Sequence, residues 1–242
     1  MKRKLAVLLV CFSTMSCIAY GSDSANRTEE PDKNESGNAV SNESVEPDEP
    51  DDIFLNESGY SVVNNSFGDV YVYWGATVSN PNANVAASFP VITVTAKGED
   101  GAIISTNDQT LFYIAPEDTV SYGGFIDCNG TAPANVEITS TCSSFVPDGS
   151  DDVVKTSDFV ISNTSEIAGD FGETTYTGEI ENIGNNNTDL VVVTLILKNN
   201  GEIVYGDTTF VDSLTPGTKK AFEISEYDLP KHTEYIISAQ SW

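Results

Sequence analysis

The second half of this sequence repeats the first at a nearly constant spacing. Three pairs of segments match: Val78-Ser79-Asn80 with Ile180-Glu181-Asn182, Gly101-Ala102-Ile103-Ile104 with Gly201-Glu202-Ile203-Val204, and Ile114-Ala115-Pro116 with Leu214-Thr215-Pro216. Repetition of this kind indicates two copies of one structural unit. Each copy has about 90 residues, which is near the lower size limit for a domain that buries its own core.

Both copies are built from short runs of β-branched and aromatic residues, separated by turn residues. Residues 92–96 (Ile-Thr-Val-Thr-Ala) alternate strictly, which predicts a strand with one buried face and one solvated face. The predicted strands are 70–74, 89–96, 103–105, 109–114, 120–126, 136–145, 159–162, 174–181, 190–197, 202–211, 221–226 and 234–242. Such closely spaced strands predict an all-β fold of two tandem immunoglobulin-like β-sandwich domains, at 58–146 and 153–242.

The apolar run 190–197 is long enough to be either a buried helix or a central strand. Its β-branched residues and the Asn and Gly residues beside it favour the strand. Asn200-Gly201 follows it, and these two residues adopt the positive φ angles of a tight hairpin turn.

The N-terminus has the pattern of an export signal. A basic start at 2–4 precedes an apolar run at 5–15, which is too short to span a bilayer. One interpretation is a signal peptide of residues 1–21, cleaved after Ala19-Tyr20-Gly21. The other is a lipobox at Thr14-Met15-Ser16-Cys17, with Cys17 lipidated. Both predict an extracytoplasmic protein, either secreted or held at the cell surface by an N-terminal lipid.

Residues 22–57 form a predicted disordered, acidic linker, because they have almost no large apolar side chains to bury. The whole chain has a formal charge of -26. A field of that sign repels nucleic acid and anionic lipid, which excludes them as expected partners. An envelope protein, a basic protein, a cation or a glycan remains compatible with it.

Several motifs of the second copy carry a family resemblance. They are Thr177-Gly178-Glu179-Ile180-Glu181-Asn182, Val193-Thr194-Leu195-Ile196-Leu197-Lys198-Asn199-Asn200-Gly201, Asp212-Ser213-Leu214-Thr215-Pro216-Gly217 and Phe222-Glu223-Ile224. With them the second copy resembles the FxLYD family of extracytoplasmic bacterial and archaeal domains. Leu195-Ile196-Leu197-Lys198-Asn199 stands where that family has Phe-x-Leu-Tyr-Asp, and the first copy is more divergent. The resemblance implies an immunoglobulin-like sandwich, often on lipoproteins and surface proteins, and carries over no catalytic residue.

Cys128 and Cys142 are the two cysteines of the predicted domains. Outside the cytoplasm such a pair favours a disulfide. If residues 129–134 form a hairpin turn, however, Cys142 lies too far along the returning strand to bond. The alternative is two separate thiols, one of them packed in the sandwich.

The segment 148–152 is a candidate calcium site between the two predicted domains. Asp148, Asp151 and Asp152 would supply the oxygen ligands that calcium prefers. The spacing differs from an EF-hand loop, and a solvated acidic linker is the preferred interpretation. No other cofactor is expected.

Aromatic residues provide a candidate platform for a sugar. Tyr71 and Tyr73 share one face of a predicted strand, Trp74 lies on the other face, and core packing is the commoner fate of such residues. His232, the one histidine, lies in a predicted turn and is expected to be a surface residue without a partner.

These features predict a non-catalytic secreted or surface protein whose tandem domains act as a binding, adhesion or spacer module of the cell envelope. The first alternative is an inhibitor or a module that binds cations or basic proteins through its acidic field. The second is a hydrolase that uses paired carboxylates, for which the sequence indicates no cleft.

Overall fold

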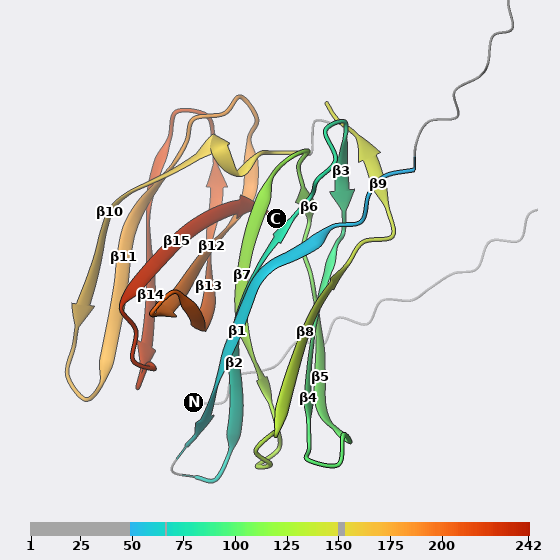
Figure 1. Cartoon of the computed structure of the whole chain (residues 1–242). Helices are drawn as coiled ribbons and strands as arrows, with labels where there is room; N and C mark the ends of the chain where they lie inside the picture. Colours follow the sequence, from blue (N-terminus) through green and yellow to red (C-terminus); the bar gives the residue numbers. More distant parts are fainter. Residues whose placement is uncertain (1–48, 66, 150–152) are drawn as a thin grey trace, which may run out of the picture. The chain divides into compact units, whose positions relative to one another are not determined.

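Strands joined by turns make up almost the whole of the computed structural model, which describes residues 49–65, 67–149 and 153–242 (Figure 1). The strands of the first half are β1 (Phe54–Asn64), β2 (Val70–Ser79), β3 (Val85–Ser88), β4 (Val91–Lys97), β5 (Ile103–Thr110), β6 (Tyr113–Ile114), β7 (Thr119–Asp127), β8 (Asn135–Thr141) and β9 (Phe145–Pro147). Those of the second half are β10 (Phe159–Ala168), β11 (Glu173–Asn182), β12 (Thr188–Asn199), β13 (Glu202–Leu214), β14 (Lys219–Tyr227) and β15 (Glu234–Ser241). One 3-10 turn, η1 (Thr156–Asp158), precedes β10. The all-β prediction is therefore confirmed.

The two halves repeat one order of strands. Sheets β1-β2-β7 and β5-β4-β8 in the first half correspond to β10-β11-β14 and β13-β12-β15 in the second, and all their pairings are antiparallel. The first half adds a small sheet, β6-β3-β9. The sequence repeat thus corresponds to a repeat of strand order.

A buried asparagine explains why the repeated segments are alike. The Asn80 side-chain amide donates to the carbonyl oxygen of Ile114 at 3.0 Å, and that of Asn182 donates to the carbonyl of Leu214 at 2.9 Å. Each asparagine therefore ties the end of β2 or β11 to the turn that precedes β7 or β14. Because a buried carbonyl needs a donor, this contact fixes the same turn in both halves.

The core of the first half lies between its two main sheets. Val72 and Trp74 of β2 pack with Ile92 and Val94 of β4 in one continuous apolar cluster. In β4 buried and part-exposed residues alternate without exception, as the strict alternation of residues 92–96 predicts.

In the second half, β12 is the central strand of its sheet and is buried on both faces. Val191 and Val193 face the sheet β10-β11-β14, whereas Val192 belongs to the apolar cluster of the first half. The hairpin after β12 has φ angles of 53° at Asn200 and 88° at Gly201. The predictions of a central strand and of this turn are confirmed.

The sheet β13-β12-β15 also packs against the sheet β1-β2-β7, where the backbones come unusually close. A Cβ atom on Gly123 would lie 2.3 Å from the carbonyl carbon of Gly206, and one on Gly206 would lie 2.8 Å from the Cα of Gly75. The Thr194 hydroxyl also donates to the carbonyl of Ser121 at 3.0 Å. Residues 47–242 accordingly form one compact unit, and the division into domains at 58–146 and 153–242 stays a prediction.

The strand β1 begins at Phe54, four residues before the predicted start of the first domain at residue 58. The side chain of Ile53, which directly precedes β1, is 6% exposed and anchors the start of the strand in the core. β1 is an edge strand with mostly exposed side chains, so its polar sequence resembles a linker. The predicted strand 109–114 is also interrupted, because β5 ends at Thr110 and β6 starts at Tyr113.

The predicted signal peptide, Cys17 and residues 22–48 of the predicted linker lie outside the described residues. In the part of the chain that the structure describes, no helix is long and apolar enough to cross a membrane.

Candidate functional site

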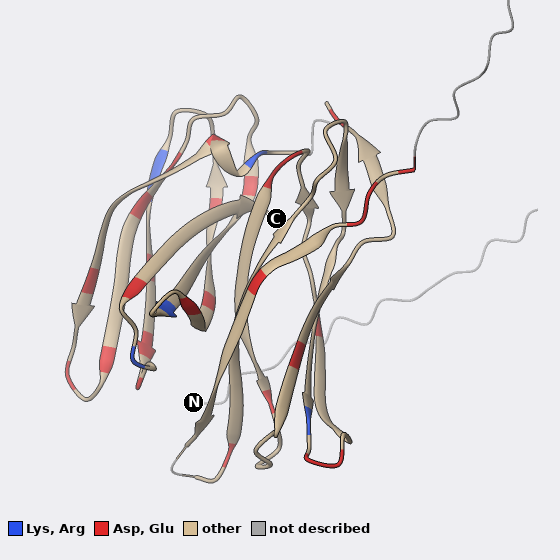
Figure 2. Cartoon of the chain, viewed as in Figure 1, with Lys and Arg blue, Asp and Glu red and all other residues tan. Residues whose placement is uncertain are grey.

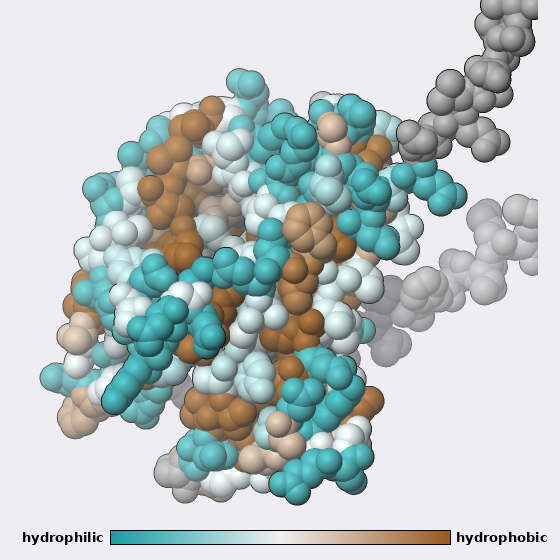
Figure 3. Space-filling model, in the orientation of Figure 1, coloured by the Kyte–Doolittle hydropathy of each residue, from teal (hydrophilic) through white to brown (hydrophobic). Residues whose placement is uncertain are grey.

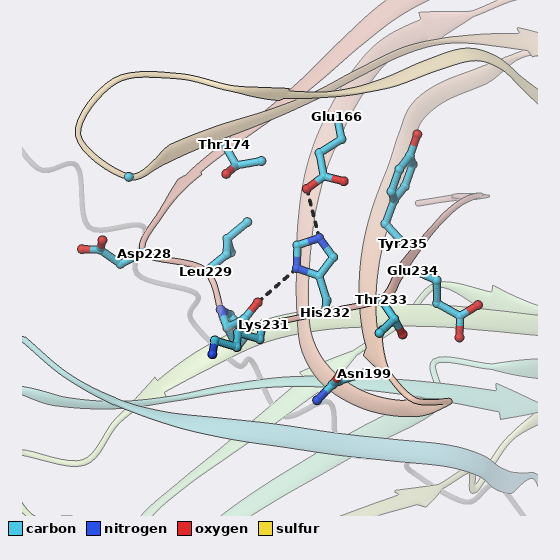
Figure 4. Close-up of a pocket in the computed structure, with 12 residues that line it drawn as sticks. Glu166, Thr174, Asn199, Asp228, Leu229, Lys231, His232, Thr233, Glu234 and Tyr235 are labelled. Carbon is cyan, nitrogen blue, oxygen red and sulfur yellow. Dashed lines mark hydrogen bonds and ion pairs between the residues drawn. The ribbon is translucent and has the colours of Figure 1, made fainter.

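A hollow of about 1030 Å³ opens at one end of the second half (Figure 4). Its walls come from Glu166 of β10, Thr174 of β11, Asn199 of β12 and the loop 228–233 between β14 and β15. His232 projects from that loop toward Glu166, and the ring of Tyr235 stands beside it.

Two polar side chains of this wall, Glu166 and His232, meet the buried Tyr176. His232 Nε2 lies 3.0 Å from Oε1 of Glu166 and 3.1 Å from the hydroxyl oxygen of Tyr176, and that hydroxyl donates to Glu166 Oε1 at 3.2 Å. On the other side of the ring, Nδ1 lies 3.0 Å from the carbonyl oxygen of Pro230. A carbonyl only accepts, so Nδ1 carries a proton in this arrangement.

His232 has partners that the sequence did not indicate, whereas its place in the wall of an open hollow agrees with a surface position. Its side chain is 16% exposed and has three polar neighbours, which come from β10, β11 and the loop itself. Glu166 is 66 residues away in the sequence, so no local pattern indicates the contact.

Tyr176 is fully buried, and this burial raises the pKa of its phenol, with the Glu166 carboxylate adding to the effect. The phenol is therefore a neutral hydrogen-bond donor at physiological pH. The hydroxyl oxygen of Thr233, next to the histidine, accepts a hydrogen bond from the backbone N–H of Asn200 at 3.0 Å and so fixes the β12–β13 turn. These groups hold the loop 228–233 in place. The Thr233 hydroxyl, which is the nearest to the imidazole in sequence, is therefore engaged in fixing the β12–β13 turn.

Two carboxyl groups that the sequence did not single out meet between β13 and β14. The carboxyl groups of Asp207 and Glu226 are close enough for the charge of Asp207 to alter the pKa of Glu226. Burial raises the pKa of Asp207. Burial, followed by the charge of Asp207, raises the pKa of Glu226 to about 7. The buried Tyr205 hydroxyl faces Glu226, and Tyr73 stacks on the Tyr205 ring at 5.1 Å.

The residues of the predicted aromatic platform lie on the two faces of β2. Trp74 is 2% exposed and stacks on Tyr122 in the core, so core packing is its fate. Tyr71 and Tyr73 share a face, as expected, and each lies 5.8 Å from the ring of Phe125. Phe125 is 54% exposed. The platform is therefore Tyr71, Phe125 and Tyr73, which we call the aromatic row.

Cys128 and Cys142 are separate thiols in this structure. Cys128 is buried in the core just beyond β7. The thiol of Cys142, just beyond β8, lies 3.0 Å from the carbonyl of Ser144. Burial raises the pKa of the Cys128 thiol, with Asp127 adding to the effect.

Of the candidate calcium ligands, Asp151 and Asp152 lie outside the described residues. Asp148 accepts a hydrogen bond from the backbone amide of Gly149 at 2.9 Å. Within the described ranges, no group of three or more acidic, histidine or cysteine side chains is arranged to hold a metal ion.

Charge and hydropathy are both distributed over the surface. Acidic residues lie on many strands of both halves rather than on one face (Figure 2). On the face shown in Figure 3, hydrophobic surface forms several patches separated by hydrophilic surface. The face in Figure 3 therefore has no single continuous apolar patch.

No protein-family model and no curated protein matches the chain. Among solved structures, red sea bream transglutaminase is similar, with a TM-score of 0.24 and 11% identity over 76% of this chain. The alignment covers 29% of that protein, so this chain spans less than a third of its length. A likeness this distant carries no functional argument. The strands and sheets themselves define the class, which is an all-β, sandwich-like protein.

Proposed function

We propose that the chain is a non-catalytic, extracytoplasmic binding module that is secreted or held at the cell surface. The aromatic row is the observation that carries this proposal, because it places the exposed ring of Phe125 beside two part-buried tyrosine rings on one sheet. Rings on a fixed backbone contribute contact area at little entropic cost, which is typical of recognition surfaces.

The packing of the sheets supports the same function. Because bare backbone meets bare backbone at Gly75, Gly123 and Gly206, the two halves present their surfaces in a fixed arrangement. The N-terminal export pattern supports a place outside the cytoplasm, and the FxLYD resemblance of the second half agrees with it.

The alternative of a module for cations or basic proteins has less support, because acidic residues are spread over both halves (Figure 2). Insensitivity of binding to salt would remove this alternative, since screening weakens contacts between exposed charges.

Binding is tested with the mature full-length chain, labelled and incubated with the envelope fraction of its source cells. We expect saturable binding that Phe125→Ser weakens at least fivefold. Phe171→Ser is the matched control, because Phe171 is 96% exposed and lies in the β10–β11 loop, outside the aromatic row. Equal binding by all three proteins would show that the aromatic row does not contribute, and no binding by any of them would contradict a binding role. Mass spectrometry of the intact purified protein identifies the cleavage site and any lipid on Cys17.

A further inference from the structure

The outer strand β10 contains a glycosylation motif that the proposed function does not use. Asn163-Thr164-Ser165 is a sequon, the Asn-x-Ser or Asn-x-Thr tripeptide at which an oligosaccharide is transferred to asparagine. Sequons also arise by chance in a chain rich in Asn, Ser and Thr. The place of the motif in the fold therefore decides whether it serves as an acceptor.

The sequon asparagines among the described residues are all exposed. They are Asn56, Asn64, Asn129, Asn163 and Asn186. The buried asparagines Asn80 and Asn182 lie outside such motifs, and their side chains hold the turns of the fold. A transferase has to reach the side-chain amide of its acceptor, so burial excludes none of the exposed sites.

A β-bulge separates Asn163 from the ladder of β10. The pairing with β11 shifts between Ser162 and Ser165, so Asn163 and Thr164 have no partner residue in β11. The φ angle of Asn163 is 53°, which lies outside the extended region of a regular strand. No strand pairs with the other edge of β10 in the part of the chain that the structure describes. The motif is therefore displayed at an open sheet edge, where bulges are common.

The amide and the hydroxyl of the motif lie on one face of the sheet. The Asn163 side-chain amide donates to Glu179 at 2.5 Å, and Ser165 pairs with Thr177. Paired residues share a face, and Glu179 and Thr177 point to the same side because they are two residues apart in β11. This is the outer side, since Tyr176, which precedes Thr177, is buried on the other. Both groups are therefore accessible from solvent.

Space for a first sugar residue lies beside Asn163. A hollow of about 440 Å³ has Asn163, Glu179 and Ala221 in its walls. Ala221 of β14 is exposed and pairs with Glu179, and its single methyl group leaves this side of the hollow open. A side-chain amide has two hydrogens, so one remains to donate to Glu179 after a sugar replaces the other.

The first half repeats this arrangement. β1 corresponds to β10, and its pairing with β2 shifts between Leu55 and Glu57, which leaves Asn56 unpaired. Asn56-Glu57-Ser58 is also a sequon, and its asparagine is exposed. Chance places sequons without regard to bulges, so their recurrence on two corresponding edge strands favours a use.

We propose that Asn163 is the acceptor of an N-linked glycan. Its Nδ2 atom forms a bond to the anomeric carbon of an oligosaccharide that is carried on a lipid diphosphate. The bond from that carbon to the phosphate oxygen breaks, and the lipid diphosphate leaves with the electron pair. Nδ2 loses one of its two protons to a base of the transferase. The inference rests on the extracytoplasmic location within the proposed function, and it adds a modification site.

The direct test is mass spectrometry of the full-length mature protein from its source cells, both intact and as proteolytic peptides. We expect the peptide that contains Asn163 to have an oligosaccharide attached to that residue. Asn163→Gln removes the acceptor and Ser165→Ala removes the hydroxyl of the motif, so each should abolish the modification. Ser165→Thr should retain it, because threonine also completes a sequon. An unmodified Asn163 in the exported protein would overturn the proposal.

Asn135→Gln is the matched control, because Asn135 is an exposed asparagine outside any sequon. It should leave the glycan on Asn163 unchanged. Sugar that stays on the same peptide in Asn163→Gln would show attachment to a hydroxyl and contradict the proposal. Cell fractionation separates this inference from the proposed function. An exported chain without the glycan leaves the binding module standing, whereas a chain retained in the cytoplasm contradicts both proposals.

Discussion

At the scale of single residues, contacts between polar groups that lie far apart in the sequence stabilise the fold. The contact of Tyr176 with Glu166 and His232 joins β11, β10 and the β14–β15 loop through one hydroxyl. The carboxyl groups of Asp207 and Glu226 meet between two facing sheets. Each contact makes a prediction about stability.

Replacement of Tyr176 with Phe removes the shared hydroxyl and leaves the ring. Net loss of such a hydrogen bond costs about 1 kcal/mol, and the buried neighbours left behind add to this. The measurement is the free energy of unfolding in urea. Tyr227→Phe is the control, because the exposed Tyr227 makes one long hydrogen bond, 3.3 Å, to Glu173. An effect no larger than that of the control would refute a stabilising role for the cluster.

The carboxyl pair predicts a pH dependence of stability. Burial and the charge of Asp207 raise the pKa of Glu226 from 4.5 to about 7 in the folded chain. Between these two pH values the folded chain holds a proton that the unfolded chain has released, so stability is lost as pH rises through this window.

Glu226→Gln replaces this carboxyl with a neutral amide and should flatten the dependence. Urea denaturation at several pH values between 4.5 and 7 measures it, with Glu223→Gln, an exposed position on the same strand, as the control. If the slope is unchanged in Glu226→Gln, the pair does not hold a proton in the folded chain.

At the scale of strands, two adjacent glycines of β7 have opposite roles. Gly123 faces β13, where a Cβ atom would meet the backbone of Gly206 at 2.3 Å. Gly124 faces Trp74, where a Cβ atom has room. Successive residues of a strand point to opposite faces, which explains the contrast.

Gly123→Ala should therefore destabilise the chain by about 1–3 kcal/mol through overpacking against rigid backbone. Gly124→Ala should leave stability unchanged or raise it slightly, because alanine is favoured over glycine within a strand by about 0.5–1 kcal/mol. Thermal unfolding of both variants checks this. The same melting temperature for the two would show that the sheets are not in backbone contact.

The strands also show what local sequence can predict. Alternation at 92–96 and the β-branched run 190–197 determine burial within a single strand, and Asn200-Gly201 determines its own turn, so these predictions are confirmed. β1 is polar because it lies at an edge, so hydrophobic alternation does not predict this strand.

The candidate sites were harder to predict, because they depend on which strands become neighbours. The contact of Asp207 with Glu226 follows from the stacking of two sheets. Only the match of Val78-Ser79-Asn80 with Ile180-Glu181-Asn182 signalled such a tertiary contact, since each segment contains a buried asparagine with the same role.

At the scale of the whole molecule, the stacking of sheets couples the two halves. Val192 of the second half lies in the core of the first, and Asp118 accepts two hydrogen bonds from Thr156, at 2.5 and 2.7 Å. Residues that share a core lose their packing together, so the halves are expected to unfold in one transition.

The two tryptophans provide the measurement, because one lies in each half. Trp242→Phe leaves Trp74 to report on the first half, and Trp74→Phe leaves Trp242 to report on the second. Both variants should show a urea transition that coincides with their own far-UV circular dichroism. Fluorescence and circular dichroism transitions that separate would show that the halves unfold independently.

The contact between β1 and the second half has a mechanical consequence. Glu57 of β1 pairs with Lys198 of β12 at 2.5 Å, and the backbone of Gly59 lies against that of Ile203 in β13. A chain anchored by its N-terminus receives any pulling force at β1. Such a load passes sideways into β12 and β13 as well as along the backbone of β1.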